Sequence, residues 1–233
     1  MNIQITDKTK THRSAMEWMT RGLGVLVGFF SFEHGLLEAL QGNTVPVTGP
    51  VGYDIKMLGF GYIIDAIGQN WKFWTGAMEP AFTVVPNYLI TGISAMTIGI
   101  IIVLWALFMM KSKFGVPGFA GLTVLMFFFG GGFATVFTSL FTVVCALLQN
   151  KERRWWKTHI PLKTALIIGR VWPWLFVFTL LFSFIAVSTT VFGYPLVWFL
   201  PDAVVGRLLL PIGHANSLLT IICVLASIVH DTL

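Results

Sequence analysis

The chain has 233 residues, of which 56% are hydrophobic and only 11% are charged, and its mean hydropathy is +0.81. Soluble domains carry about a quarter charged residues, so this composition indicates an integral membrane protein. The net charge of +5 does not indicate nucleic-acid binding, because the basic residues form short clusters beside apolar runs, where membrane proteins place them. The sequence therefore predicts a single all-α domain over residues 1–233, built as a bundle of transmembrane helices.

The first predicted span covers residues 22–41 and follows a polar, basic lead over residues 1–20. The lead lacks the short apolar core and small-residue cleavage site of a signal peptide, so we expect it to stay on the cytoplasmic side of a plasma membrane that the chain crosses several times. At about 100° per residue, glycines and polar residues gather on one half of the span. They are Arg21, Gly24, Gly28, Ser31, His34, Gly35, Glu38, Gln41 and Gly42. Since ionisable groups in a membrane segment normally face the protein interior, this stripe predicts a site.

His34 and Glu38 lie one helical turn apart on this stripe. That spacing lets an imidazole and a carboxyl group share a proton or a metal ion. The alternative is a buried hydrogen-bonded pair that only fixes the packing of the helix. Glu33 points about 100° away from His34 and about 140° away from Glu38, so we expect it to pair with a cation on another helix or to hold a protonated hydrogen bond.

Residues 43–79 form the longest predicted loop, which we expect on the extracytoplasmic side. The loop begins with turn-forming prolines and glycines between residues 46 and 52. Within it, residues 57–68 are apolar but too short to cross a bilayer, which needs about 20 residues, so they predict an interfacial or re-entrant piece.

The second predicted span begins at Glu79 and Pro80, an acid and a proline of the kind that helix N-termini prefer, and ends near Met110. Polar residues recur in it at helical spacing. They are Thr83, Asn87, Thr91 and Ser94. This second stripe is either a hydrogen-bond ladder that packs helices or part of a binding site, and Asn87, next to Pro86, is its strongest candidate for a site residue.

Residues 117–148 are mostly apolar and decide the topology. As one helix they would measure about 48 Å, against about 30 Å for the hydrocarbon core of a bilayer. Three glycines at 130–132 favour a break. If the segment crosses once, the chain has five spans, and the two sides receive six and seven basic residues. If the segment enters and leaves the membrane on the same side, the cytoplasmic side receives eleven basic residues and the other side two. The positive-inside rule therefore favours four spans plus a glycine-broken, re-entrant segment.

Two further spans are predicted at residues 164–190 and 203–229. A basic loop at residues 151–163 precedes them and suits an anionic lipid surface. The last span places Arg207 and His214 on one face, with Pro211 and Gly213 loosening the helix just before His214. Both side chains are therefore candidates for the polar site.

The favoured functional hypothesis is a polar cavity that binds or passes a small molecule or ion within the bilayer. Broken helices with exposed ends are how membrane carriers build such sites, and a histidine can change its protonation near neutral pH. The candidate residues are His34, Glu38, Asn87, the break at 130–132, Arg207 and His214.

Two alternatives remain open. In a metal-dependent membrane enzyme, His34, Glu38 and His214 would bind zinc and leave one position for water, and a related hypothesis places a haem between the two histidines. In the second alternative the chain is a structural subunit of an oligomer or larger membrane assembly. Its nine Trp and 21 Phe favour protein interfaces as much as lipid-facing belts.

Three stretches resemble motifs of small polytopic bacterial membrane proteins with no assigned function. They are HGLLEALQGN at 34–43, EPAFTVVPNYLITG at 79–92 and FFFGGGF at 127–133. The resemblance brings no activity or ligand with it. It implies that the three stretches belong together in one fold.

Overall fold

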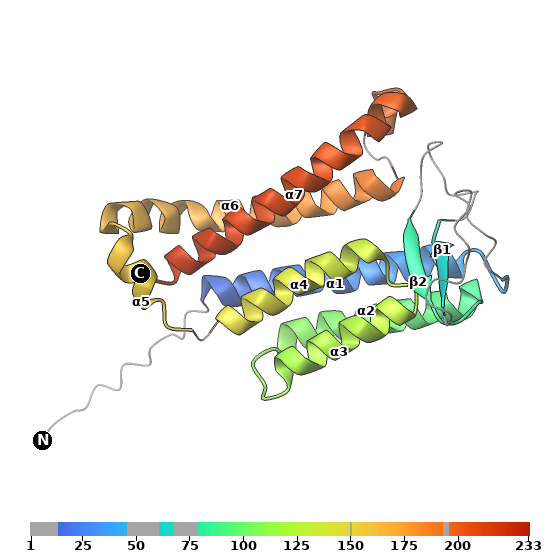
Figure 1. The fold of residues 1–233 in the computed structure, drawn as a ribbon, viewed down its shortest axis with the longest axis horizontal. Coiled ribbons are helices and arrows are strands. Elements are labelled where there is room, and N and C mark those ends of the chain that lie inside the picture. The colour runs from blue at the N-terminus through green and yellow to red at the C-terminus, as the bar shows by residue number, and fades with distance from the viewer. Residues whose placement is uncertain (1–13, 46–60, 68–78, 150, 193–195) are drawn as a thin grey trace, which may run out of the picture.

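The computed structural model describes residues 14–45, 61–67, 79–149, 151–192 and 196–233 (Figure 1). Helices make up most of this part of the chain, and two short strands form a small sheet. In chain order the elements are α1 (Ala15–Ala39), β1 (Tyr62–Asp65), β2 (Pro80–Thr83), α2 (Tyr88–Phe108), α3 (Gly115–Phe128), α4 (Phe133–Leu148), α5 (Arg154–His159), α6 (Leu162–Phe192), the 3-10 turn η3 (Leu196–Trp198) and α7 (Asp202–His230).

Helix α1 is the centre of the bundle and packs against α2, α4, α6 and α7. It meets α2 through glycines of the predicted stripe. A Cβ atom at Gly28 would lie 2.5 Å from the carbonyl oxygen of Gly99, and a Cβ atom at Gly35 would lie equally close to that of Gly92. The two backbones are therefore in direct contact, as small residues allow in membrane helix pairs.

The segment 117–148 folds as a helical hairpin. Helix α3 runs toward the small sheet and α4 returns from it, with the three glycines between them (Figure 1). Gly130 and Gly132 have φ angles of 85° and 75°, a left-handed conformation that side chains with a Cβ rarely adopt, so the helix ends there. The predicted helix break at the glycines is confirmed, and α4 packs back against α3. With 14 and 16 residues, α3 and α4 are about 21 Å and 24 Å long, shorter than a hydrocarbon core of about 30 Å.

In the described ranges of the chain, three helices, α2, α6 and α7, are long and apolar enough to cross a membrane. The ends of α6 and α7 agree with the predicted spans to within two residues. The predicted start of the second span was wrong, because Pro80 opens a strand and helix α2 begins only at Tyr88. Helix α1 has 25 residues and includes Glu17, Arg21 and two further carboxyl groups, and it is not one of these three.

The two strands pair antiparallel, with Tyr62 opposite Thr83 and Asp65 opposite Pro80. No strand was predicted, because four-residue segments are too short to show an alternating pattern. The fold is therefore mostly helical rather than all-α. Strand β1 falls within the predicted interfacial piece at 57–68, whose first four residues and last residue lie outside the described chain.

One end of the bundle collects the start of α1, the turn between α2 and α3, the end of α4, α5 and the end of α7 (Figure 1). Asp231 ties this end together. Its carboxylate accepts hydrogen bonds from the backbone N–H groups of Ala15 at 2.6 Å and Met16 at 3.1 Å, and it pairs with Arg153 at 3.0 Å. The carboxylate thus caps the first turn of α1, where the helix dipole favours negative charge.

Candidate functional site

His34 lies on the inward face of α1 with no exposed surface. Its Nδ1 donates to the carbonyl oxygen of Phe30, one turn earlier, at 2.9 Å. Its Nε2 therefore points at Glu79, and the two form a hydrogen bond. Because a carbonyl oxygen only accepts, Nδ1 carries a proton, and a second proton lies between Nε2 and the carboxyl group. The pair is either imidazolium with carboxylate or imidazole with carboxylic acid, and its net charge is zero in both forms.

Glu79 reaches His34 from the start of β2 and is the main site residue that sequence analysis missed. Its backbone N–H donates to the carboxylate of Asp65 at 3.0 Å, and the same oxygen accepts from the N–H of Ile67 at 3.2 Å. Glu79 as a whole residue is 4% exposed. In the sequence, Glu79 followed by a proline was interpreted as the start of a helix. Glu79 is also the only charged residue between Lys72 and Lys111, and this isolation in an apolar stretch could have identified it as a site residue.

Glu38 was the predicted partner of His34, and the structure corrects this pairing. Glu38 has no exposed surface, and neither of its carboxyl oxygens makes a hydrogen bond of normal geometry. The Thr91 hydroxyl interacts with the carboxyl group and also shares a 2.8 Å hydrogen bond with the Thr83 hydroxyl. Because His34 and Glu38 sit one turn apart, they lie at different depths along α1, and Glu79 occupies the position that faces the imidazole.

The glycine turn between α3 and α4 forms a wall against both side chains. A Cβ atom added to Gly130 would collide with the Glu38 carboxyl group, and one added to Gly132 would collide with the His34 ring. The turn is held in place by the N–H of Gly130, which donates to the carbonyl of Phe82 in β2 at 2.9 Å. The predicted break in the chain therefore touches the predicted polar face of α1.

Glu33 lies beside this cluster and is partly exposed. Its Oε2 atom is buried and has no hydrogen-bond partner, and its carboxyl group interacts electrostatically with His34 and Glu79. The structure assigns Glu33 no cation partner among the described residues.

Asn87 caps helix α2 and lies outside the cluster. Its Oδ1 accepts from the N–H of Ile90 at 3.0 Å, and its Nδ2 donates to the side chain of Asn43 at 2.6 Å. Asparagine is among the preferred N-cap residues, so the fold of α2 accounts for this side chain. Thr83 and Thr91, from the same predicted stripe, lie at the site instead.

A cleft of about 750 Å³ lies between α1 and α4 on one side and α6 and α7 on the other. Glu79 lines this cleft while bonding to His34, and His214 lines it from α7. Arg207 is exposed on α7 and does not line it. The structure therefore brings His34, through Glu79, to the same cavity as His214, and it leaves Arg207 out.

The predicted zinc site does not form. His34, Glu38 and His214 are not gathered, and the described ranges hold no group of three or more His, Cys, Asp or Glu side chains placed to bind a metal ion. Both ring nitrogens of His34 are bonded to protein atoms, and His214 uses its Nδ1 to donate to the carbonyl of Leu210 at 2.7 Å. The same bonds leave Nε2 of His34 unable to ligate a haem iron without breaking its pairing with Glu79.

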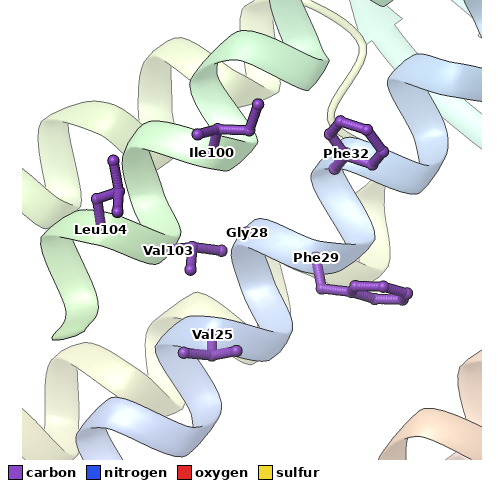
Figure 2. A pocket seen from close by; sticks show the side chains of 7 residues that line it. All are labelled: Val25, Gly28, Phe29, Phe32, Ile100, Val103 and Leu104. Carbon is purple, nitrogen blue, oxygen red and sulfur yellow. The ribbon is translucent and has the colours of Figure 1, made fainter.

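A second, smaller pocket of about 270 Å³ lies on the seam between α1 and α2 (Figure 2). It is lined by Val25, Gly28, Phe29, Phe32, Ile100, Val103 and Leu104. None of these side chains can donate or accept a hydrogen bond. The groove therefore offers no group to orient a polar ligand, in contrast to the cleft beside Glu79.

Comparison with protein-family models, with curated proteins and with solved structures finds no match to this chain. Residues of the stretches 34–43, 79–92 and 127–133 nevertheless meet in space. They supply His34 and Glu38 from 34–43, Glu79 and Thr91 from 79–92, and the glycine turn from 127–133.

Proposed function

We propose that the protein binds a small molecule within the membrane, in the cleft between α1, α4, α6 and α7, and recognises it through Glu79. One observation carries this proposal: Glu79 lines the cleft, and its carboxyl group is at the same time hydrogen-bonded to the fully buried His34. If the protein passes its ligand across the bilayer, this is the site that the ligand would occupy.

The chemistry of the pair supports a binding role. Titratable groups inside a membrane protein are costly to bury and usually serve function. A packing contact alone could be made by apolar side chains at lower cost. The cleft volume also falls within the range of about 300 to 1,000 Å³ typical of small-molecule sites, which combine an apolar lining with a few polar groups.

The test is native mass spectrometry of the protein released from mild detergent. We expect the wild-type chain to carry a bound small molecule, and Glu79→Gln to lose it while unfolding at a similar temperature. Glu152→Gln is the matched control, because Glu152 is exposed at the opposite, basic end of the bundle. A molecule retained equally by both variants would contradict the proposal, and so would a wild-type chain that carries none.

We further propose that the chain is a multi-pass plasma-membrane protein with both termini in the cytoplasm. The positive-inside asymmetry supports this, because the turn before α3 and helix α5 lie at the same end of the bundle (Figure 1). Single cysteines introduced as Lys113→Cys and Trp155→Cys should react with an impermeant thiol reagent from the same side. Reaction from opposite sides would exclude the return of the α3 and α4 hairpin within the membrane.

A further inference from the structure

The cleft opens sideways between α4 and α7. Helix α4 packs on α1 and α3, whereas in the described chain it makes no extensive contact with α6 or α7. Two of the lining side chains, Phe137 on α4 and Leu210 on α7, are 66% and 71% exposed. Exposed aromatic and aliphatic groups on the apolar helices of a membrane protein face lipid chains, so the mouth of the cleft is apolar and faces the bilayer interior.

The cleft is elongated along the bundle. On α7 its lining extends from Gly206 to Thr220, which corresponds to about 21 Å along a helix that rises about 1.5 Å per residue. Among the lining residues that the structure describes, Glu79, from the sheet end of the bundle, is the only Asp, Glu, Lys or Arg. A long and mainly apolar space with one carboxyl group matches a chain-like molecule that carries a single polar head.

The polar atoms of the lining favour a head that donates hydrogen bonds. Glu79 offers a carboxyl group, and within the part of the chain that the structure describes no Lys or Arg lines the cleft to neutralise an anion. The Nδ1 of His214 donates to the Leu210 carbonyl, so a neutral His214 ring presents Nε2 as an acceptor. An anionic head would therefore find no described Lys or Arg in the lining to pair with it, because the His34 ring already shares its proton with Glu79.

We infer that the ligand is an amphiphile dissolved in the bilayer, with one apolar chain and an uncharged or cationic head that donates hydrogen bonds to Glu79. It enters between α4 and α7 without passing through water. This inference rests on the proposed function and adds the chemical class of the ligand and its route.

The experiment uses three probes of equal chain length, a long-chain primary alcohol, the corresponding primary amine and the corresponding carboxylic acid. Each carries a photoreactive diazirine in mid-chain. The full chain is reconstituted in phosphatidylcholine vesicles, irradiated and mapped by peptide mass spectrometry. We expect saturable labelling of the peptides that contain Phe137 and Leu210 by the alcohol and the amine, and labelling weaker by about tenfold or more with the acid.

Two glycines provide a matched pair of variants. A Cβ atom added to Gly213, in the cleft, meets nothing within 4 Å, and the same holds for Gly121 on α3, outside the cleft. Gly213→Leu should fill the cleft and reduce the saturable labelling to background, whereas Gly121→Leu should leave it unchanged. Ser217→Leu, at an exposed position of the same lining, repeats the test at a second site should Gly213→Leu not fold.

The outcomes separate the two proposals. If labelling spreads over the outer faces of the helices and is the same in Gly213→Leu as in the wild type, the amphiphile inference is overturned. If the carboxylic acid labels the cleft as strongly as the alcohol and the amine do, the inferred head-group preference is overturned. If either occurs while native mass spectrometry still shows a Glu79-dependent molecule, the proposed function stands with a ligand of another class. If neither the saturable cleft labelling nor the Glu79-dependent bound molecule is observed, the proposed binding site is overturned as well.

Discussion

The two sides of helix α1 are packed in opposite ways. Toward α2 the backbones touch at Gly28 and Gly35, and the seam leaves only a small apolar groove (Figure 2). Toward α6 and α7 the packing opens into a cleft almost three times larger that reaches Glu79. The contrast suggests a division of labour, in which the closed side fixes the position of His34 and the open side gives a ligand access to its partner.

The largest expected loss of stability comes from adding a side chain at the contact between α1 and α2. Gly35→Leu adds a side chain where a Cβ atom would lie 2.5 Å from the backbone oxygen of Gly92. A backbone cannot rotate aside as a side chain does, so we expect a loss of at least about 3 kcal/mol in the free energy of unfolding, or no folded protein.

Gly213→Leu is the comparison on the open side. Because its added side chain meets open space, we expect unchanged stability or a gain of up to about 1 kcal/mol from helix propensity. Both values are measured by unfolding in mixed detergent micelles. Equal losses in the two variants would show that the sides of α1 do not differ in packing.

The next effect concerns the glycine wall. Gly132→Ala combines a positive φ with a collision against His34, and we expect it to cost about 3 kcal/mol. Gly42→Ala is the control, because Gly42 has a φ of 77° but nothing within 4 Å of an added Cβ, so only the backbone cost of about 1 kcal/mol remains. Thermal unfolding of both proteins measures the difference, and similar values would mean that the wall does not press on His34.

How far the sequence specifies the fold depends on the range of the interactions. The ends of α6 and α7 follow from long apolar runs, and the hairpin turn follows from three adjacent glycines, because both signals are local. The hydrogen-bond partner of His34 could not be predicted from local sequence signals. Glu79 lies 45 residues away, and it reaches the imidazole only because β1 and β2 pair and bring Asp65 to its backbone.

Asn87 and His214 were both predicted as site residues, and they show which part of that prediction depended on local signals and which on tertiary packing. Asn87 directly precedes an apolar helix, and this position alone identifies an N-cap, so its assignment to the binding site overlooked a local signal. His214 was predicted as a site residue because it is a polar group in an apolar helix, and in the structure it lines the cleft. Its place across the cleft from α1, however, depends on how α6 and α7 dock, which no spacing within α7 encodes.

The smallest expected effect is that of Glu38→Gln. The amide has nearly the same shape as the carboxyl group, and Glu38 makes no hydrogen bond of normal geometry that the change would break. We expect the free energy of unfolding to change by less than about 1 kcal/mol and the bound molecule to remain. A loss of binding as complete as that expected for Glu79→Gln would place Glu38 in the binding site after all.

The most direct measurement is the ¹⁵N NMR spectrum of the protein with labelled histidines, in which His34→Gln assigns the His34 ring signals. Because Glu79 shares a proton with His34 and lines the cleft, we expect a saturating long-chain primary alcohol to shift the Nε2 resonance of His34 in the wild type and not in Gly213→Leu. An Nε2 resonance that stays unchanged while the alcohol labels the cleft would show that the buried pair and the cleft are not connected.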